Sequence, residues 1–381
     1  MEFLSSIPWL VIISAVAKTL FLIFLVVLPM VSYTVYAERR VSALIQDRLG
    51  PNRTGFPLTL FGFKKDISPF LGGLGQPVAD AMKFMLKEEF TPAHVNKPYY
   101  LLAPVLAMVP ALVTLAVIPF GSYLFGQKMV IADVNVGILY IFAIASIGVY
   151  GIVLAGWASN SKYSFLGSIR SSSQMISYEL ALGLSAVPVL MVFGKLNLSD
   201  IVNYQAANGW LLLPLWGEGL SLQRWILLVP IAISFVVFTI SMFAETNRLP
   251  FDLPESETEL VAGYHTEYAA MKFALFFLGE YAAMITGSSV IVVLFLGGWH
   301  VPFFPENSAA LSTTFGGILL GLLHITAFFA KVALLLLFFI WVRWTLPRFR
   351  YDQLMRVGWL YLFEIALVNI FLTAGILAFI K

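Results

Sequence analysis

Carboxylate side chains are concentrated in one stretch of the chain. Seven of them, offset only by Arg248 and Lys272, are Glu245, Asp252, Glu255, Glu257, Glu259, Glu267 and Glu280. Apolar and aromatic residues are interspersed among these acids. Carboxyl groups held close together in partly desolvated surroundings have raised, interdependent pKa values and can share and pass protons. The stretch therefore predicts a proton relay that runs from a loop into the membrane. The alternative is a charged but solvated loop.

Four glutamates lie within or at the ends of predicted membrane spans. Glu179 falls near the start of the fourth span, Glu245 at the end of the fifth, Glu280 well inside the sixth and Glu364 in the cytoplasmic third of the eighth. An ionisable group at bilayer depth costs roughly 2.5 to 3.5 kcal/mol on insertion scales, so it needs a functional or structural reason. For Glu364, snorkelling or a bond to a neighbouring helix is an equally good explanation. Glu280 is the sharpest candidate because of its depth.

The composition indicates that most of the chain lies in a lipid bilayer, and it excludes several classes of protein. The 381 residues are 60% hydrophobic and only 12% charged, whereas soluble domains have about 25% charged residues. Because cysteine is absent, the chain forms no disulfide and holds no cysteine-bound iron–sulfur cluster. A net charge of +2 gives no reason to expect nucleic-acid binding. The four histidines lack ligand spacing, so no metal site is predicted.

The carboxylates are positioned by apolar runs that are long enough to span a membrane. About eight transmembrane helices are expected, near Trp9 to Tyr33, Leu101 to Phe125, Gly137 to Trp157, Met175 to Phe193, Trp225 to Ala244, Ala269 to Leu296, Gly316 to Trp344 and Gly358 to Ile380. The prediction is an all-α, polytopic membrane helix bundle that forms one integral membrane domain over residues 1–381.

The loops differ in their charge. Basic residues are concentrated in the odd-numbered connections, which places these connections in the cytoplasm and both termini outside it. The cytoplasmic loop 34–100 is predicted to contain two amphipathic helices. One covers Glu38 to Arg48 and lies along the membrane surface. The second covers Gln76 to Lys87, where Pro77 suits a first helical turn. Residues 245–268 form the acidic cytoplasmic loop.

Five sequence blocks carry a resemblance to a known family. They are Ala37-Glu38-Arg39-Arg40 with Arg48-Leu49-Gly50-Pro51-Asn52; Gln76-Pro77-Val78-Ala79-Asp80-Ala81-Met82-Lys83; Gly156-Trp157-Ala158-Ser159-Asn160-Ser161 through Ser177-Tyr178-Glu179; Ala244-Glu245-Thr246-Asn247-Arg248 through Glu267-Tyr268; and Pro347-Arg348-Phe349-Arg350-Tyr351-Asp352. In these blocks the chain closely resembles the H-type membrane subunits of bacterial NADH:quinone oxidoreductase, the counterparts of subunit 1 of mitochondrial respiratory complex I. The blocks span nearly the whole chain.

The resemblance implies a role for particular residues. Quinone, shared with partner subunits, would be bound in a tunnel lined or shaped by Arg39, Arg48, Asp80 and Phe277. The proton channel would consist of Glu179, Glu245, Glu255, Glu257 and Glu280. Supporting residues would be Glu38, Arg170, Tyr178, Arg248, Arg348 and Asp352. One departure from the family is a longer segment from Phe56 to Leu74.

The resemblance also implies the setting. The chain would be a subunit of the bacterial plasma (inner) membrane that performs no redox chemistry alone and holds no FMN, iron–sulfur cluster or metal. Its partners would be the peripheral-arm subunits of the quinone site, adjacent small membrane subunits and lipids.

Two alternatives remain at this point. The homologous membrane subunit of an energy-converting hydrogenase or a related dehydrogenase shares the scaffold, and a stand-alone ion transporter would explain the buried acids.

Overall fold

The computed structural model describes residues 9–52, 54, 73–214, 222–254, 257–302 and 314–380. Within them, eight helical stretches are long and apolar enough to cross a membrane: Ile13–Ile45, Lys97–Val117, Gly137–Ala158, Lys162–Phe193, Arg224–Glu245, Ala270–Phe295, Gly316–Thr345 and Tyr351–Ile380. The prediction of an all-α bundle with about eight membrane helices is confirmed. Residues 55–72, which include most of the long Phe56 to Leu74 segment, lie outside the described residues.

The helices follow one another along the chain with few other elements. The α-helices are α2 (Trp9–Leu20), α3 (Leu28–Ile45), α4 (Gln76–Leu86), α5 (Lys97–Val113), α6 (Gly137–Ala145), α7 (Ile147–Ala158), α8 (Lys162–Phe193), α9 (Leu198–Asn208), α10 (Leu222–Glu245), α11 (Glu257–Leu260), α12 (Ala270–Phe295), α13 (Thr314–Thr345), α14 (Tyr351–Arg356) and α15 (Phe363–Ile380). The π segments η1 (Phe21–Val27) and η7 (Val357–Leu362) continue neighbouring helices, and η3 (Thr114–Val117) and η5 (Gly263–His265) are 3-10 turns. A hairpin pairs β1 (Tyr123–Leu124) with β2 (Gln127–Lys128).

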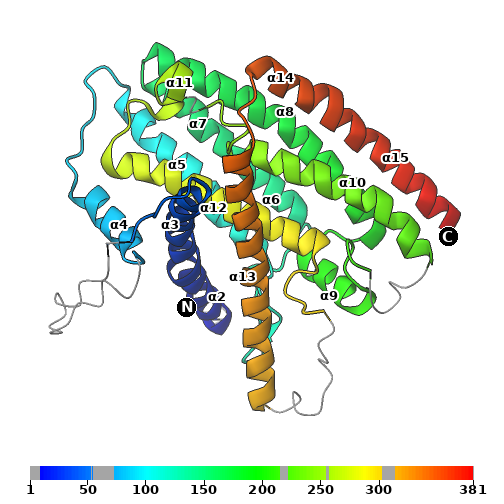
Figure 1. The fold of residues 1–381 in the computed structure, drawn as a ribbon. Helices are drawn as coiled ribbons and strands as arrows, with labels where there is room; N and C mark the ends of the chain where they lie inside the picture. Colours follow the sequence, from blue (N-terminus) through cyan, green and yellow to red (C-terminus); the bar gives the residue numbers. More distant parts are fainter. Residues whose placement is uncertain are drawn as a thin grey trace, which may run out of the picture.

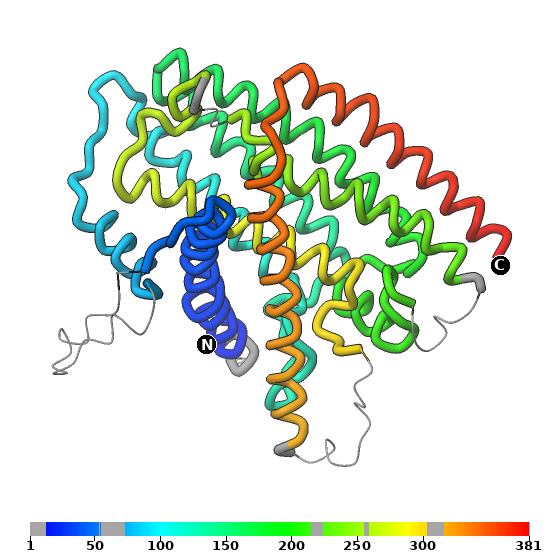
Figure 2. Tube along the Cα trace, in the orientation of Figure 1, coloured from blue at the N-terminus to red at the C-terminus, as the bar shows by residue number. Residues whose placement is uncertain are grey.

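Helix α12 is the central element of the bundle (Figure 1). It contacts α5, α10, α13 and α3, and α5, α7, α8 and α10 pack on one another beside it. In its second half, every residue from Tyr281 to Phe295 is buried except Ala283, which is partly exposed. Figure 2 shows the N-terminal helix and α13 on one side of α12, while α15 lies at the outer edge against α8 and α10. The core therefore consists of apolar helices packed around α12.

Two helix boundaries differ from the predictions in ways that affect the site. Residues 38–45 do not form a separate surface helix, because α3 continues the first span without a break to Ile45. Glu38 is thereby buried at 7% exposure. Helix α8 begins at Lys162, so Glu179 lies inside the helix and not near its start. The first half of α8 buries Ser164, Ser168 and Ser171, and the Ser168 hydroxyl donates to the carbonyl oxygen of Phe165 in the same helix at 2.8 Å.

The segment after the second span also differs from prediction. Helix α5 ends at Val113 and passes through η3 into the hairpin of β1 and β2, whereas the apolar run predicts helix to Phe125. Helix α9 is an element that the apolar runs do not predict. It begins where the Asn197 side chain accepts hydrogen bonds from the backbone N–H groups of Ser199 and Asp200, a normal N-cap. The hairpin and α9 are too short or too polar to resemble a membrane span.

Candidate functional site

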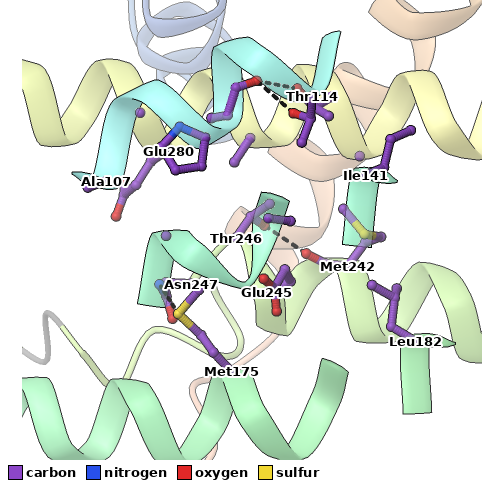
Figure 3. Close-up of a pocket in the computed structure, with 18 of the residues that line it drawn as sticks. Ala107, Thr114, Ile141, Met175, Leu182, Met242, Glu245, Thr246, Asn247 and Glu280 are labelled. Atoms are coloured by element: carbon purple, nitrogen blue, oxygen red, sulfur yellow. Dashed lines mark hydrogen bonds between the residues drawn. The ribbon is translucent and has the colours of Figure 1, made fainter. Parts of the chain in front are cut away.

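A cavity of about 100 Å³ lies between α5, α6, α7, α8, α10 and α12. Most of its lining is apolar, but Glu245 and Glu280 both reach it from different helices, together with Thr114, Thr246, Asn247 and Tyr264. Figure 3 shows Glu245 on the α10 side and Glu280 on the α12 side of this space. Two acids from different parts of the sequence therefore share one mostly apolar cavity.

Glu245 is the last residue of α10, and the chain turns sharply after it. Asn247 has a φ of +51°, a left-handed conformation that asparagine tolerates better than most residues. The Gln174 side chain holds this turn, since its Nε2 donates to the carbonyl oxygens of Ala244 and Phe251 at 2.8 Å each. Oε2 of Glu245 is buried and has no hydrogen-bond partner among the described residues. A buried carboxyl oxygen in this state is suited to accept a proton or a water molecule.

Glu179 belongs to α8, which packs against α10, the helix that ends at Glu245. It is not among the residues that line the cavity of Glu245 and Glu280. Its place in the proton path therefore stays a prediction.

Glu280 is held by two groups from the acidic loop. Arg248 Nη2 lies 3.2 Å from its Oε2, and the Tyr264 hydroxyl donates to its Oε1 at 3.4 Å. The side chains of Glu280 and Arg248 are only 10% and 5% exposed. An ion pair this deeply buried requires compensation for the loss of water.

A chain of polar contacts leads away from Glu280 toward the first helix. The Arg248 guanidinium lies 4.1 Å from the centre of the Tyr281 ring. The Tyr281 hydroxyl donates to Oε2 of Glu38 on α3 at 2.5 Å, and Arg343 of α13 pairs with the other oxygen of Glu38. Charge at Glu38 and charge at Glu280 are therefore connected through two side chains.

Two of the residues predicted to line the quinone tunnel, Arg39 and Asp80, meet at this end of α3. Arg39 follows Glu38 and forms an ion pair of 2.8 Å with Asp80 of α4. Asp80 also accepts a hydrogen bond of 2.9 Å from Gln76. Arg48 is exposed and bonds to Gln46. Phe277 packs its ring against Phe273 and His265 near η5.

The supporting residues are not all brought to one place. Tyr178 donates to the Leu354 carbonyl at 2.9 Å, Arg348 pairs with Asp252 at 2.8 Å and Arg170 pairs with Glu259 at 2.7 Å. Asp352 contacts its neighbour Arg350 in an exposed pair. Glu255 and the side chain of Glu257 lie outside the described residues.

The loops that carry these residues meet on one side of the bundle. The Tyr100 hydroxyl donates to the Glu267 carbonyl at 2.7 Å, and the Phe349 N–H donates to the Pro250 carbonyl at 3.2 Å. Tyr268 stacks on Tyr100 with ring centres 4.1 Å apart. Burial, and then the neighbouring Tyr100, raises the pKa of Tyr268 well above its usual range, so this phenol stays neutral.

Sequence reasoning missed four residues of the site: Tyr264, Tyr281, Arg343 and Gln174. Tyr281 adjoins Glu280, which is an available signal, since a tyrosine beside a buried acid is a ready hydrogen-bond donor. In the sequence, Arg343 indicates only the orientation of its loop. Its pairing with Glu38 depends on helix packing.

Comparison with known proteins decides the family. Residues 17–374 match the NADH dehydrogenase family. The chain is 48% identical over 360 residues to an H subunit of NADH-quinone oxidoreductase from Geobacter metallireducens, covering 93% of this chain and 94% of that protein. It is 47% identical over 360 residues to the H subunit from Salinibacter ruber, covering 94% and 95%. The chain belongs to the H-subunit family of NADH-quinone oxidoreductase. The resemblance noted in the sequence blocks is thereby confirmed.

Family membership fixes the class of protein. As a member of the H-subunit family with eight candidate spans among its described residues, the chain is a multi-pass membrane protein. A third relative, an H subunit from Cytophaga hutchinsonii, is 44% identical over 357 residues and covers 93% of this chain and 94% of its own. The absence of cysteine means that this chain holds no cysteine-ligated iron–sulfur cluster.

Proposed function

We propose that this chain, a membrane subunit of NADH-quinone oxidoreductase, forms part of a quinone tunnel with its partner subunits and contains a carboxylate path that couples quinone reduction to proton translocation. The quinone is a substrate that receives electrons from redox centres on other subunits. The path comprises Glu179, Glu245 and Glu280, with Glu255 and Glu257 at its loop end.

One observation carries the proposal: Glu245 and Glu280 line the same cavity, and Glu280 is connected to the α3 side through Arg248, Tyr281 and Glu38. Glu38 adjoins Arg39, whose partner Asp80 belongs to α4. A mostly apolar cavity strengthens electrostatic interactions between the charges that line it. A change of charge near Glu38 and Arg39 would therefore alter the strength of the ion pair between Arg248 and Glu280.

The residues of this chain suggest how the coupling operates. Quinone reduction consumes two electrons and two protons, and the site must gain protons as electrons arrive. Negative charge near Glu38 and Arg39 would draw the Tyr281 proton and the Arg248 guanidinium toward α3. Glu280, less well neutralised by Arg248, would then take up a proton, and the cavity would let it reach Glu245 through water.

The experiment that tests the path uses matched carboxyl-to-amide variants in the native membrane. We expect Glu280→Gln and Glu245→Gln to lower quinone reductase activity and proton pumping together, by on the order of tenfold or more, while the complex still assembles. Asp200→Asn is the control, because Asp200 is an exposed acid of α9 that pairs with Lys195. Normal pumping in both variants would overturn the proton path.

The two alternatives fare differently against these findings. The relatives that match over more than nine-tenths of the chain are named as subunits of NADH-quinone oxidoreductase, which disfavours a hydrogenase membrane subunit. A stand-alone ion transporter would move ions when the purified chain is placed in liposomes. Our proposal expects no such flux without partner subunits.

We also propose that both termini face away from the cytoplasm, as the distribution of bases predicts. Since the chain contains no cysteine, single thiols report its topology. A cysteine replacing Lys87, after α4, should react with an impermeant maleimide only from the cytoplasmic side. A cysteine replacing Asp200, in α9, should react only from the other side. The reverse pattern would contradict the orientation.

A further inference from the structure

Glu364 is an acidic residue of a membrane helix, and it contributes no polar contact to the described part of the helix bundle. It lies in the first turn of α15, a helix at the outer edge of the molecule (Figure 1), and its side chain is exposed. No hydrogen bond or ion pair joins it to the rest of the described chain. The helix runs without a break from Tyr351 to Ile380. At 1.5 Å per residue, Glu364 lies roughly 12 Å further along the helix than Arg356, the nearest basic residue before it in the sequence.

Glu364 opens onto a groove between α15 and α10. The groove has an empty volume of about 550 Å³ and is lined by Ile233, Glu364, Ile365, Val368, Asn369 and Leu372. Val368 is 64% exposed and Leu372 is 42% exposed. The groove is apolar except for Glu364 and Asn369, which both belong to α15.

Asn369, the other polar residue of the groove, joins α15 to α10. Its side chain is only 3% exposed, and its Nδ2 donates to the Pro230 carbonyl and to the Ser234 hydroxyl at 2.9 Å each. Its Oδ1 is buried and lacks a hydrogen-bond partner among the described residues. Buried polar groups in membrane helices are normally satisfied by a partner. The Glu364 carboxylate offers only acceptor oxygens and is exposed, so the occupant must bring donors.

We propose that this groove receives a transmembrane helix of a neighbouring protein subunit, and that this helix places a hydrogen-bond donor opposite Glu364. Lysine, arginine or hydroxyl side chains have the required chemistry. A lipid headgroup is disfavoured by depth, because headgroups lie at the interface whereas the groove extends to Leu372. The π segment η7, which directly precedes α15, agrees with a specialised site, since such segments are frequent at functional positions.

The surface does not depend on the proposed proton path. Glu364 and Asn369 are not among the residues that line the cavity of Glu245 and Glu280. Docking here and proton transfer there are therefore separable by experiment.

The first test compares two neighbouring positions of α15. Val368→Cys introduces a thiol into the groove, and Leu367→Cys introduces one about 100° away around the helix. Because the chain has no cysteine of its own, each thiol is unique within it. We expect a lipid-soluble maleimide to label Val368→Cys at least tenfold more slowly in the assembled membrane enzyme than in the isolated full-length chain. Equal labelling of Val368→Cys in the two states would overturn the proposal.

A photoreactive maleimide on the same Val368 thiol identifies the occupant. A protein adduct whose cross-linked peptide is a transmembrane segment with a donor side chain supports the proposal. Adducts with lipid alone overturn it. The Leu367→Cys sample provides the background of cross-linking from the flank of the helix.

The third measurement tests the role of the carboxylate itself. Glu364→Leu should reduce the amount of neighbouring membrane subunits that copurify with the tagged chain by roughly fivefold, the loss expected for one interhelical hydrogen bond. Glu364→Gln keeps a polar side chain of the same size and should retain most of the partner, and Leu367→Ala is the control. Full copurification with Glu364→Leu would rule out the carboxylate as a docking contact.

Discussion

The Tyr281 hydroxyl donates a hydrogen bond of 2.5 Å to Oε2 of Glu38, although the two residues are 243 positions apart. This contact joins the central helix α12 to α3 at the point where the site meets the loop 34–100. Glu280 precedes Tyr281 on α12, so the contact lies directly beside the candidate proton path.

The Tyr281 hydroxyl should therefore matter for coupling more than for assembly. Tyr281→Phe keeps the ring under the Arg248 guanidinium and removes only the donor to Glu38. We expect quinone reductase activity to fall on the order of tenfold, since hydrogen bonds to charged groups contribute roughly 1.5 to 3 kcal/mol. The assay is activity per assembled complex in native membranes. Unchanged activity would show that this contact serves only to pack the helices.

Close packing of α5 on α7 forms one wall of the cavity and depends on Gly151. A Cβ added there would lie 2.5 Å from the backbone nitrogen of Ala107, and a backbone atom cannot move aside cheaply. Gly151→Ala should lower the free energy of unfolding by roughly 1 to 3 kcal/mol, measured as a lower melting temperature in detergent. Gly183→Ala is the matched control, because its added Cβ has no neighbour within 4 Å.

The fold was largely predictable, and particular residues show where prediction ended. Long apolar runs determine the spans because lipid requires each backbone polar group to be satisfied within a helix. The first half of α8, from Lys162 to Gln174, is not predicted because its serines resemble loop residues by composition, although Ser164, Ser168 and Ser171 are buried in the helix. The break of α3 expected near Glu38 does not occur, because no proline or glycine lies between Pro29, in the first turn of α3, and Gly50.

The candidate site was only half predictable. The acids stood out because charge is rare in this chain, and the blocks around them carried the family resemblance. The partners of those acids did not stand out. Arg343 pairs with Glu38 over 305 positions, a contact that depends on how α13 crosses α3. Buried networks of this kind are set by tertiary packing, which no local pattern in a single sequence encodes.

Lys331 should stabilise the far end of α12. Its Nζ donates to the carbonyl oxygens of Leu296, Gly298 and His300 at 2.9, 2.8 and 2.7 Å, and it lies 4.0 Å from the Trp210 ring centre. Lys331→Met would leave these carbonyls without their donor, at a cost of roughly 3 kcal/mol or more. A lower yield of assembled chain and a lower melting temperature are expected. Lys18→Met, which removes a more exposed contact with Lys128, should have a smaller effect.

The loop around Asp133 should make stability depend on acidity. Partial burial alone would raise the pKa of Asp133, but hydrogen bonds from Lys128, Asn197 and Ser199 outweigh it and lower the pKa below the usual value of 3.8. The folded state thus favours the carboxylate, and its contribution is present above pH 3.8 and is lost as the pH falls through the lower, folded pKa. Asp133→Asn should reduce stability by roughly 0.2 to 1 kcal/mol at about pH 7. The difference from the parent chain should shrink below about pH 4. An equal difference at both pH values would contradict this account.

The buried pair of Arg248 and Glu280 gives the sharpest test of the electrostatics. Removing one partner leaves an uncompensated charge in a dry site, so Arg248→Met should destabilise the chain by roughly 3 to 5 kcal/mol. Adding Glu280→Gln removes the orphaned charge and should restore part of that loss, which a double-mutant cycle of melting temperatures measures. Quinone reductase activity should stay low in the double variant, because the carboxyl of the proposed path is absent. Effects on stability that simply add would show that Arg248 and Glu280 act independently, and would remove the basis for linking Glu38 to the cavity through Arg248.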